Sequence, residues 1–127
     1  MVKKDKKIII ADDEKDILSI YHDKFSLSGF DVVSTDKGKA VFDLAVKHQP
    51  DIILLDIMMI DTDGYKVVKK LKTTQKTKNI PVIMLSNLGH GEAIAKGILN
   101  GADDYIVKVN YTPQEIVEKI NIFLQGD

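Results

Sequence analysis

Short, continuous apolar runs alternate along this chain with longer stretches whose apolar residues follow a helical period. Apolar runs of this length, without polar alternation, are typical of strands that helices cover on both faces. The predicted strands are residues 7–11, 31–35, 51–56, 80–86 and 104–108. Because predicted strands and helices alternate strictly, we expect an α/β fold, a doubly wound five-stranded parallel sheet with five helices on both faces.

A helix is predicted after each strand, and each helix has a capping or breaking residue at one end or both. The signals are Asp13 or Glu14 and Gly29 for the first helix, Asp36 for the second, Gly64 for the third, Gly101 for the end of the fourth, and Thr112, Pro113 and Glu115 for the fifth. Thr112 and Glu115 have the spacing of a capping box, in which each side chain accepts a hydrogen bond from the other residue's backbone N–H.

Polar side chains stand where several predicted strands end. Asp12 and Asp13 follow the first strand, Asp56 ends the third, Ser86 ends the fourth and Lys108 ends the fifth. The carboxyl ends of parallel strands lie at one edge of a sheet, where ligands of doubly wound folds bind. We therefore expect three carboxylates, one hydroxyl and one ammonium to converge.

Three close carboxylates repel one another unless a cation or protons intervene. A cluster of oxygen donors without His or Cys suits a hard ion such as Mg²⁺. A carboxylate beside Mg²⁺, with a hydroxyl and a lysine able to hold phosphoryl oxygens, is suited to phosphoryl transfer onto an aspartate.

Composition limits the other classes of function. The chain has 127 residues, enough for about one domain, and a formal net charge of -1. All of its basic residues are Lys, which argues against direct nucleic-acid recognition, and it has no Cys for disulfides or thiolate chemistry. No apolar run reaches the roughly 20 residues of a membrane span. These features predict a cytoplasmic protein without direct nucleic-acid or membrane partners.

Five segments together resemble a known family over essentially the whole chain. They are "ADDE" (11–14), "DIILLDIMMIDTDGY" (51–65), "IPVIMLS" (80–86), "AKGILNGADDYIVK" (95–108) and the closing helix. In their order and spacing they resemble the CheY-like receiver domain of two-component response regulators. The resemblance implies the flavodoxin-like strand order 2-1-3-4-5 and a phosphorylation-activated signalling switch. It also implies a phosphoryl donor, either a histidine kinase or a histidine phosphotransfer protein, and a downstream effector protein.

The resemblance also assigns roles to single residues. Asp56 would take the phosphoryl group, and Asp13, Asp56 and the Met58 carbonyl would ligate Mg²⁺, with Asp12 holding the ion largely through water. Ser86 and Lys108 would contact the phosphoryl oxygens, and Ser86 and Tyr105 would act as switch residues. Met58 and Leu88 would flank the approach of a hydrolytic water. Since neither can orient that water, we expect slow autodephosphorylation and no other enzymatic activity.

Two other classes of function compete with this interpretation. A haloacid-dehalogenase-like phosphotransferase or phosphatase also uses Asp, Lys and Mg²⁺. A chain that resembled that family would have a second Asp two residues after its nucleophile, but here that position is Met58. A receiver-like interaction module that is never phosphorylated would not need the five site residues, which are Asp12, Asp13, Asp56, Ser86 and Lys108.

Asp103 and Asp104 precede the fifth strand and are expected at the opposite sheet edge. The histidines, His22, His48 and His90, are expected to have surface or packing roles.

Three residues depart from the family pattern: Ile60 and Val109 replace usual prolines, and Asn87 replaces a small residue. A cis peptide bond before a residue other than proline is unfavourable by about 2.5–4 kcal/mol, so we expect a trans Lys108–Val109 bond with Lys108 still at the site. The loop 87–92 is expected to move on phosphorylation.

The apolar residues of the first helix cover about half of its circumference, with Ile20 and Leu27 at the edge of that arc. The arc is either a broadly buried face or, as the resemblance suggests, a docking surface for the phosphoryl donor.

The family's output face is formed by the fourth helix, the fifth strand and the fifth helix. We expect residues 1–127 to form a single receiver domain without an output domain of its own, as a monomer or a phosphorylation-dependent dimer.

Overall fold

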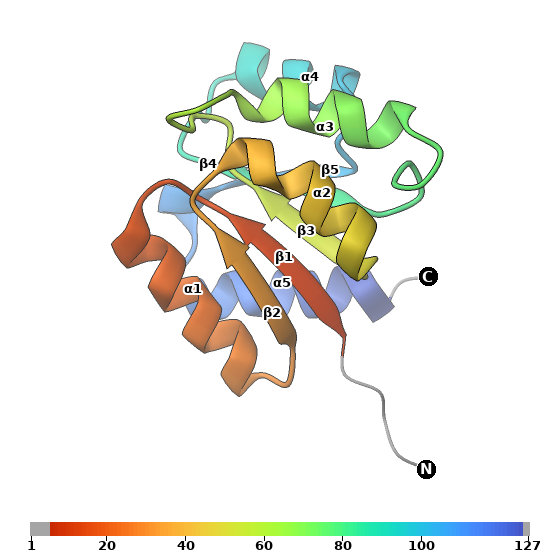
Figure 1. The fold of residues 1–127 in the computed structure, drawn as a ribbon. Helices are drawn as coiled ribbons and strands as arrows, with labels where there is room; N and C mark the ends of the chain where they lie inside the picture. The colour runs from red at the N-terminus through yellow and green to blue at the C-terminus, as the bar shows by residue number, and fades with distance from the viewer. Residues whose placement is uncertain (1–5, 126–127) are drawn as a thin grey trace.

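A computed structural model describes residues 6–125 and contains the predicted parallel sheet (Figure 1). The strand order is β2-β1-β3-β4-β5, as expected. The strands are β1 (Lys7–Ala11), β2 (Asp31–Thr35), β3 (Ile52–Leu55), β4 (Val82–Ser86) and β5 (Asp104–Val107). The helices are α1 (Lys15–Leu27), α2 (Gly38–His48), α3 (Gly64–Thr73), α4 (Gly91–Leu99) and α5 (Pro113–Gln125), with a 3₁₀ turn η1 (Lys108–Asn110) before α5.

Three strands are shorter than predicted. Asp51 and Asp56 lie just outside β3, and Pro81, which has no N–H to donate to a strand partner, precedes β4. Lys108 leaves β5 and begins η1, so the chain turns immediately after the strand. The prediction of Lys108 as a strand residue was therefore wrong by one position.

Helix-capping predictions were correct for α5 and wrong for α2. The Thr112 N–H donates to Glu115 Oε1 at 2.8 Å and the Glu115 N–H donates to Thr112 Oγ1 at 3.1 Å, which is the predicted capping box. For α2 the N-cap position is Lys37, and the capping carboxylate is that of Asp61, which accepts hydrogen bonds from two backbone N–H groups at the start of the helix. Asp36 instead forms ion pairs at the surface.

The sheet lies between two groups of helices, with α1 and α5 on one face and α2, α3 and α4 on the other (Figure 1). It therefore separates two apolar clusters, one against each face. Successive side chains of a strand point to opposite faces, so Ile8 and Ile10 pack toward α1 and α5, whereas Ile9 packs toward α2 and α3. Central strands β1, β3 and β4 are buried throughout or nearly so, as their continuous apolar sequences predicted. No helix among residues 6–125 is both long enough and apolar enough to span a lipid bilayer.

Helix α1 uses only part of its apolar face to cover the sheet. Tyr21 and Phe25 are buried, whereas Ile20 is 43% exposed and Leu27 is 85% exposed. The interpretation of the whole arc as a buried face was therefore wrong for these two residues. Both are available at the surface, but only Ile20 lies in the half of α1 nearer the loop that contains Asp13, because Leu27 ends the helix.

Candidate functional site

Three acidic side chains meet at the carboxyl edge of the sheet, as predicted. Ala11 pairs in register with Leu55, so Asp12 and Asp56, the residues that follow them, leave neighbouring strands side by side. Carboxylate oxygens of Asp12, Asp13 and Asp56 all lie within 4.8 Å of one another. Such a set of oxygen donors could hold a hard divalent cation.

Lys108 holds the buried carboxylates together. Its Nζ donates hydrogen bonds to Asp12 Oδ2 at 2.5 Å and to Asp56 Oδ2 at 3.0 Å, and it lies 3.7 Å from Glu14 Oε1. The Lys108–Val109 peptide bond is trans and Lys108 reaches the site, both as predicted. Burial alone would lower the pKa of Lys108, but its hydrogen bond to Asp12 and the charges of Asp56 and Asp12 raise it.

Asp56 is only 6% exposed, and burial raises the pKa of its carboxyl group, although Lys108 offsets part of this effect. Its Oδ1 accepts a hydrogen bond from the Ile57 N–H at 2.7 Å. With Oδ2 bound to Lys108, both oxygens are oriented. An ionised, fixed carboxylate beside a cation is a suitable oxygen nucleophile.

A cavity of about 240 Å³ opens over this carboxylate. Its lining includes Asp13, Asp56, Ser86 and Lys108, together with Met58, Asn87 and Leu88. Asp13 and Glu14 thus face the cavity beside Asp56, whereas Asp12 does not line it, is 1% exposed and already accepts hydrogen bonds from Lys108 and from the Glu14 N–H. The side chain of Met58 is 63% exposed at the mouth.

Ser86 and Tyr105 both bind the backbone of Leu88. Ser86 Oγ accepts a hydrogen bond from the Leu88 N–H at 3.3 Å, and the Tyr105 hydroxyl donates to the Leu88 carbonyl oxygen at 2.5 Å. The two predicted switch residues are therefore linked through one peptide segment. Sequence reasoning named Ser86, Tyr105 and Leu88 but gave no sign of this connection.

Two residues that support the site were missed as functional positions. A Cβ atom at Gly64 would lie 2.3 Å from the Asp56 carbonyl oxygen, and the Gly64 N–H donates to the Ile57 carbonyl at 2.7 Å. Asp61, in the same loop, binds the start of α2. The sequence indicated Gly64 only as a signal for the third helix, and no residue near Asp61 indicated that it would bind the start of α2.

Asp103, His22 and His90 take no part in the acidic cluster, as expected. Asp103 binds the Val82 N–H at 2.8 Å and Lys72 at 2.7 Å, at the opposite edge of the sheet. His22 Nδ1 lies 3.0 Å from Ser34 Oγ. His90 caps α4 by accepting a hydrogen bond from the Ala93 N–H, a structural role that the sequence did not specify.

The pattern of the response regulator receiver domain matches residues 8–121 of this chain. The "Probable transcriptional regulator ycf27" of Galdieria sulphuraria is 36% identical over 124 residues, which is 98% of this chain and 47% of that protein. The "DNA-binding dual master transcriptional regulator RpaA" of Synechocystis sp. is 35% identical over 122 residues, 94% of this chain and 49% of that protein. The chain thus spans about half the length of these curated relatives.

Solved structures of receiver domains are also similar to this chain in fold. The receiver domain of the Francisella response regulator 1452 is 32% identical with a TM-score of 0.84, covering 95% of this chain and 98% of that one. The BeF₃-activated DrrB receiver domain is 28% identical with a TM-score of 0.83, covering 97% of this chain and all of that one.

Proposed function

This chain belongs to the response regulator receiver domain family of two-component signalling, and on that basis we propose that Asp56 accepts the phosphoryl group that switches the domain. The observation that carries the proposal is the placement of Asp56 Oδ2 3.0 Å from Lys108 Nζ, beside two further carboxylates and under a cavity. The matching family is the receiver domain and not that of haloacid-dehalogenase-like phosphotransferases, which argues against that alternative.

In the proposed step a carboxylate oxygen of Asp56 attacks the phosphorus of a phosphohistidine or a small phosphodonor. A P–O bond forms, the bond from phosphorus to the leaving nitrogen or oxygen breaks, and the leaving group takes up a proton. Lys108, already at hydrogen-bond distance from Asp56, would hold a phosphoryl oxygen. Asp13, Asp56 and the Met58 carbonyl would hold Mg²⁺, with Asp12 acting through water; the ion would neutralise charge on the phosphoryl oxygens.

We further propose that phosphorylation acts through Leu88. If the Ser86 hydroxyl turns to donate to a phosphoryl oxygen, it gives up the hydrogen bond from the Leu88 N–H. The Tyr105 hydroxyl, which donates to the Leu88 carbonyl, then loses a fixed partner. The signal would thereby reach the loop 87–90 and β5, and from there the face formed by α4, β5 and α5.

The proposed donor is a histidine kinase or a histidine phosphotransfer protein, and the recipient of the signal is an effector protein or a further domain. The relative RpaA, about twice as long as this chain, is named as DNA-binding. The prediction of no direct nucleic-acid contact is therefore restricted to the residues of this chain. Slow autodephosphorylation, controlled by Met58 and Leu88, belongs to the same proposal.

Incubation with acetyl phosphate and Mg²⁺, followed by mass spectrometry, tests the assignment. Phosphate should appear on Asp56, and Asp56→Asn should abolish labelling because an amide is not a competent nucleophile. Asp43→Asn, an exposed carboxylate on α2, is the matched control and should label normally. Continuous release of phosphate without a labelled protein would indicate a phosphatase, and absence of both would indicate an interaction module. Equal labelling of the Asp56→Asn protein would contradict the mechanism.

A further inference from the structure

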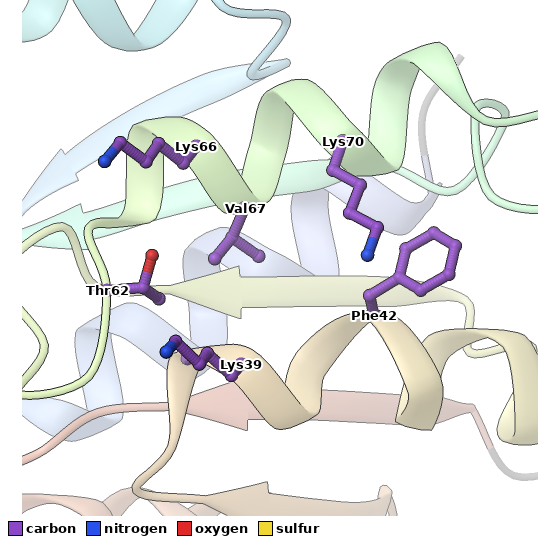
Figure 2. A pocket seen from close by; sticks show the side chains of 7 residues that line it. Lys39, Phe42, Thr62, Lys66, Val67 and Lys70 are labelled. Carbon is purple, nitrogen blue, oxygen red and sulfur yellow. The ribbon is translucent and has the colours of Figure 1, made fainter.

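A second, larger cavity lies between α2 and α3, away from the cluster of carboxylates (Figure 2). Its volume is about 310 Å³, against about 240 Å³ for the cavity over Asp56. Helix α2 forms one wall and α3 the other, and the loop that precedes α3 reaches one end of it (Figure 2). Nothing in the proposed phosphoryl transfer uses this groove, so its lining calls for a separate explanation.

The two ends of the groove differ in chemistry. Lys39 and Lys66 lie at one end on opposite walls, with Thr62 between them, and Phe42 lies at the other end (Figure 2). Val67 forms an apolar surface between the ends. The groove therefore offers ammonium groups and a hydroxyl at one end and an aromatic ring at the other.

The aromatic end also has a cation. Lys70 Nζ lies 4.3 Å from the centroid of the Phe42 ring, which is cation–π distance. Phe42 is only partly buried and belongs to the lining of the groove. A planar group entering the groove would meet an aromatic surface and an ammonium together.

Helix α3 and the segment that follows it carry a net charge opposite in sign to that of the whole chain. Residues 64–91 contain six Lys and no Asp or Glu, whereas the net charge of the chain is -1. Two carboxylates lie near the cationic end. Both bind helix starts, and Asp63 Oδ2 also lies 3.9 Å from Lys66 Nζ in an exposed ion pair. Asp61 accepts hydrogen bonds from the first N–H groups of α2, which lower the pKa of its carboxyl group, and Asp63 accepts one from the Lys66 N–H. The three lysines that line the groove outnumber these two acids, so an anion is attracted.

We propose that the α2–α3 groove binds a small phosphorylated ligand with a planar aromatic ring, of the nucleoside phosphate class. Lysines bind phosphate as point charges without needing the fork geometry of arginine, which this chain lacks. The ring of such a ligand lies against Phe42, and its phosphates lie between Lys39 and Lys66. The volume matches the lower range of small-molecule sites, about 300–1,000 Å³.

Titration of the ¹⁵N-labelled protein with ADP in the presence of EDTA tests this proposal. Because the metal is removed and Asp56→Asn can serve as the background, chemistry at Asp56 does not interfere. Backbone amide shifts are expected at residues 38–42 and 62–70, with a dissociation constant of about 1 mM or lower. Phe42→Leu should weaken binding about fivefold or more, the loss expected for one base–aromatic contact.

Charge variants separate a specific site from general attraction. Lys66→Gln should weaken ADP binding several-fold, whereas Lys69→Gln, an equal change of charge on α3 outside the groove lining, should leave it nearly unchanged. Lys66 is exposed, so its variant remains informative if Phe42→Leu destabilises the fold. Equal losses in the two lysine variants would overturn the proposal.

Three further outcomes would also overturn it. The first is the absence of groove shifts with ADP. The second is binding of pyrophosphate as tight as that of ADP, because the ring would then contribute nothing. The third is perturbation of the same amides by an octaglutamate peptide but not by ADP, which would make the groove a docking surface for acidic protein segments.

Discussion

Lys108 Nζ lies 3.0 Å from Asp56 Oδ2, although 52 residues separate them in the sequence. The same ammonium group binds Asp12, so one lysine pairs with carboxylates from the ends of two neighbouring strands and offsets part of their negative charge. Buried charges are tolerated only when they are paired and hydrogen-bonded. In the metal-free domain, Lys108 is the partner that makes the acidic cluster compatible with folding.

Replacing Asp56 by Asn is expected to stabilise the metal-free domain at neutral pH. Burial raises the pKa of Asp56 above its ordinary 3.8, so the folded state keeps this proton to higher pH than the unfolded state does. Stability contributed by the protonated form is therefore lost as the pH rises from 3.8 through the raised folded value. The melting temperature of Asp56→Asn in EDTA should exceed that of the wild type at pH 7, and the difference should shrink toward pH 3.

The exposed Asp43→Asn is the control for that measurement, and its difference from the wild type should vary little with pH. A wild-type protein more stable than Asp56→Asn at pH 7 would show that Lys108 more than offsets the burial of the carboxylate. The pairing in the cluster would then dominate desolvation, contrary to our expectation.

Asp13→Ala should reduce Mg²⁺ affinity more than Asp12→Ala. Asp13 faces the cavity, whereas Asp12 is buried and both of its oxygens already accept hydrogen bonds. We expect losses of roughly 100-fold for Asp13→Ala and about tenfold for Asp12→Ala, the range seen for residues that bind or orient a metal. Calorimetric titration with Mg²⁺ measures both, and the reverse order would contradict the proposed ligand set.

Gly64→Ala should destabilise the domain by about 1–3 kcal/mol, the usual range for overpacking. Its Cβ would lie 2.3 Å from the Asp56 carbonyl oxygen, so the loop would have to shift. Gly91→Ala is the matched control, because a Cβ there meets nothing within 4 Å and the residue begins α4. That variant should be neutral or more stable by up to about 1 kcal/mol in denaturant unfolding. Equal stability of the two variants would exclude the steric explanation.

Met58→Asn combined with Leu88→Glu should accelerate loss of phosphate from Asp56. Both side chains line the cavity over the carboxylate, and neither offers a hydrogen bond to a water. An amide and a carboxylate there could orient the attacking water and take up its proton. Decay of the label in Mg²⁺ measures the effect, and an unchanged lifetime would show that these positions do not control hydrolysis.

Ile20→Glu should leave the domain folded and impair phosphotransfer from a protein donor. Ile20 is 43% exposed on α1, so its replacement removes little core packing. Labelling by acetyl phosphate should stay normal. Ile122→Glu, at a 70% exposed residue of α5, is the matched control and should keep both activities. Equal loss of protein-donor transfer in the two variants would argue against docking on α1.

The sequence allowed the fold and much of the site to be predicted because both depend on local patterns. Continuous apolar runs located the strands, and the parallel arrangement brought Asp12, Asp56 and Lys108 to one edge. Contacts between distant loops were not predictable in this way. Asp61 caps α2 from 23 residues away, and no signal near Asp36 showed that its place as cap was already taken.

The position of Gly64 against the Asp56 carbonyl likewise depends on the path of an entire loop. The link from Ser86 and Tyr105 to Leu88 depends on where the loop after β4 returns to β5. Residue type indicated which side chains carry chemistry. It did not indicate which backbone groups they would bind.

The division of the core into two layers has a consequence for the newly made chain. The layer between the sheet and α1 is completed by Ile116, Val117 and Ile120 of α5. Translation adds about 5–20 residues per second, so β1, β2 and β3 leave the ribosome several seconds before α5 does. During that interval Phe25 and its neighbours lack their final covering. The nascent domain therefore presents an apolar face that chaperones can bind, and this face closes only when α5 has been synthesised.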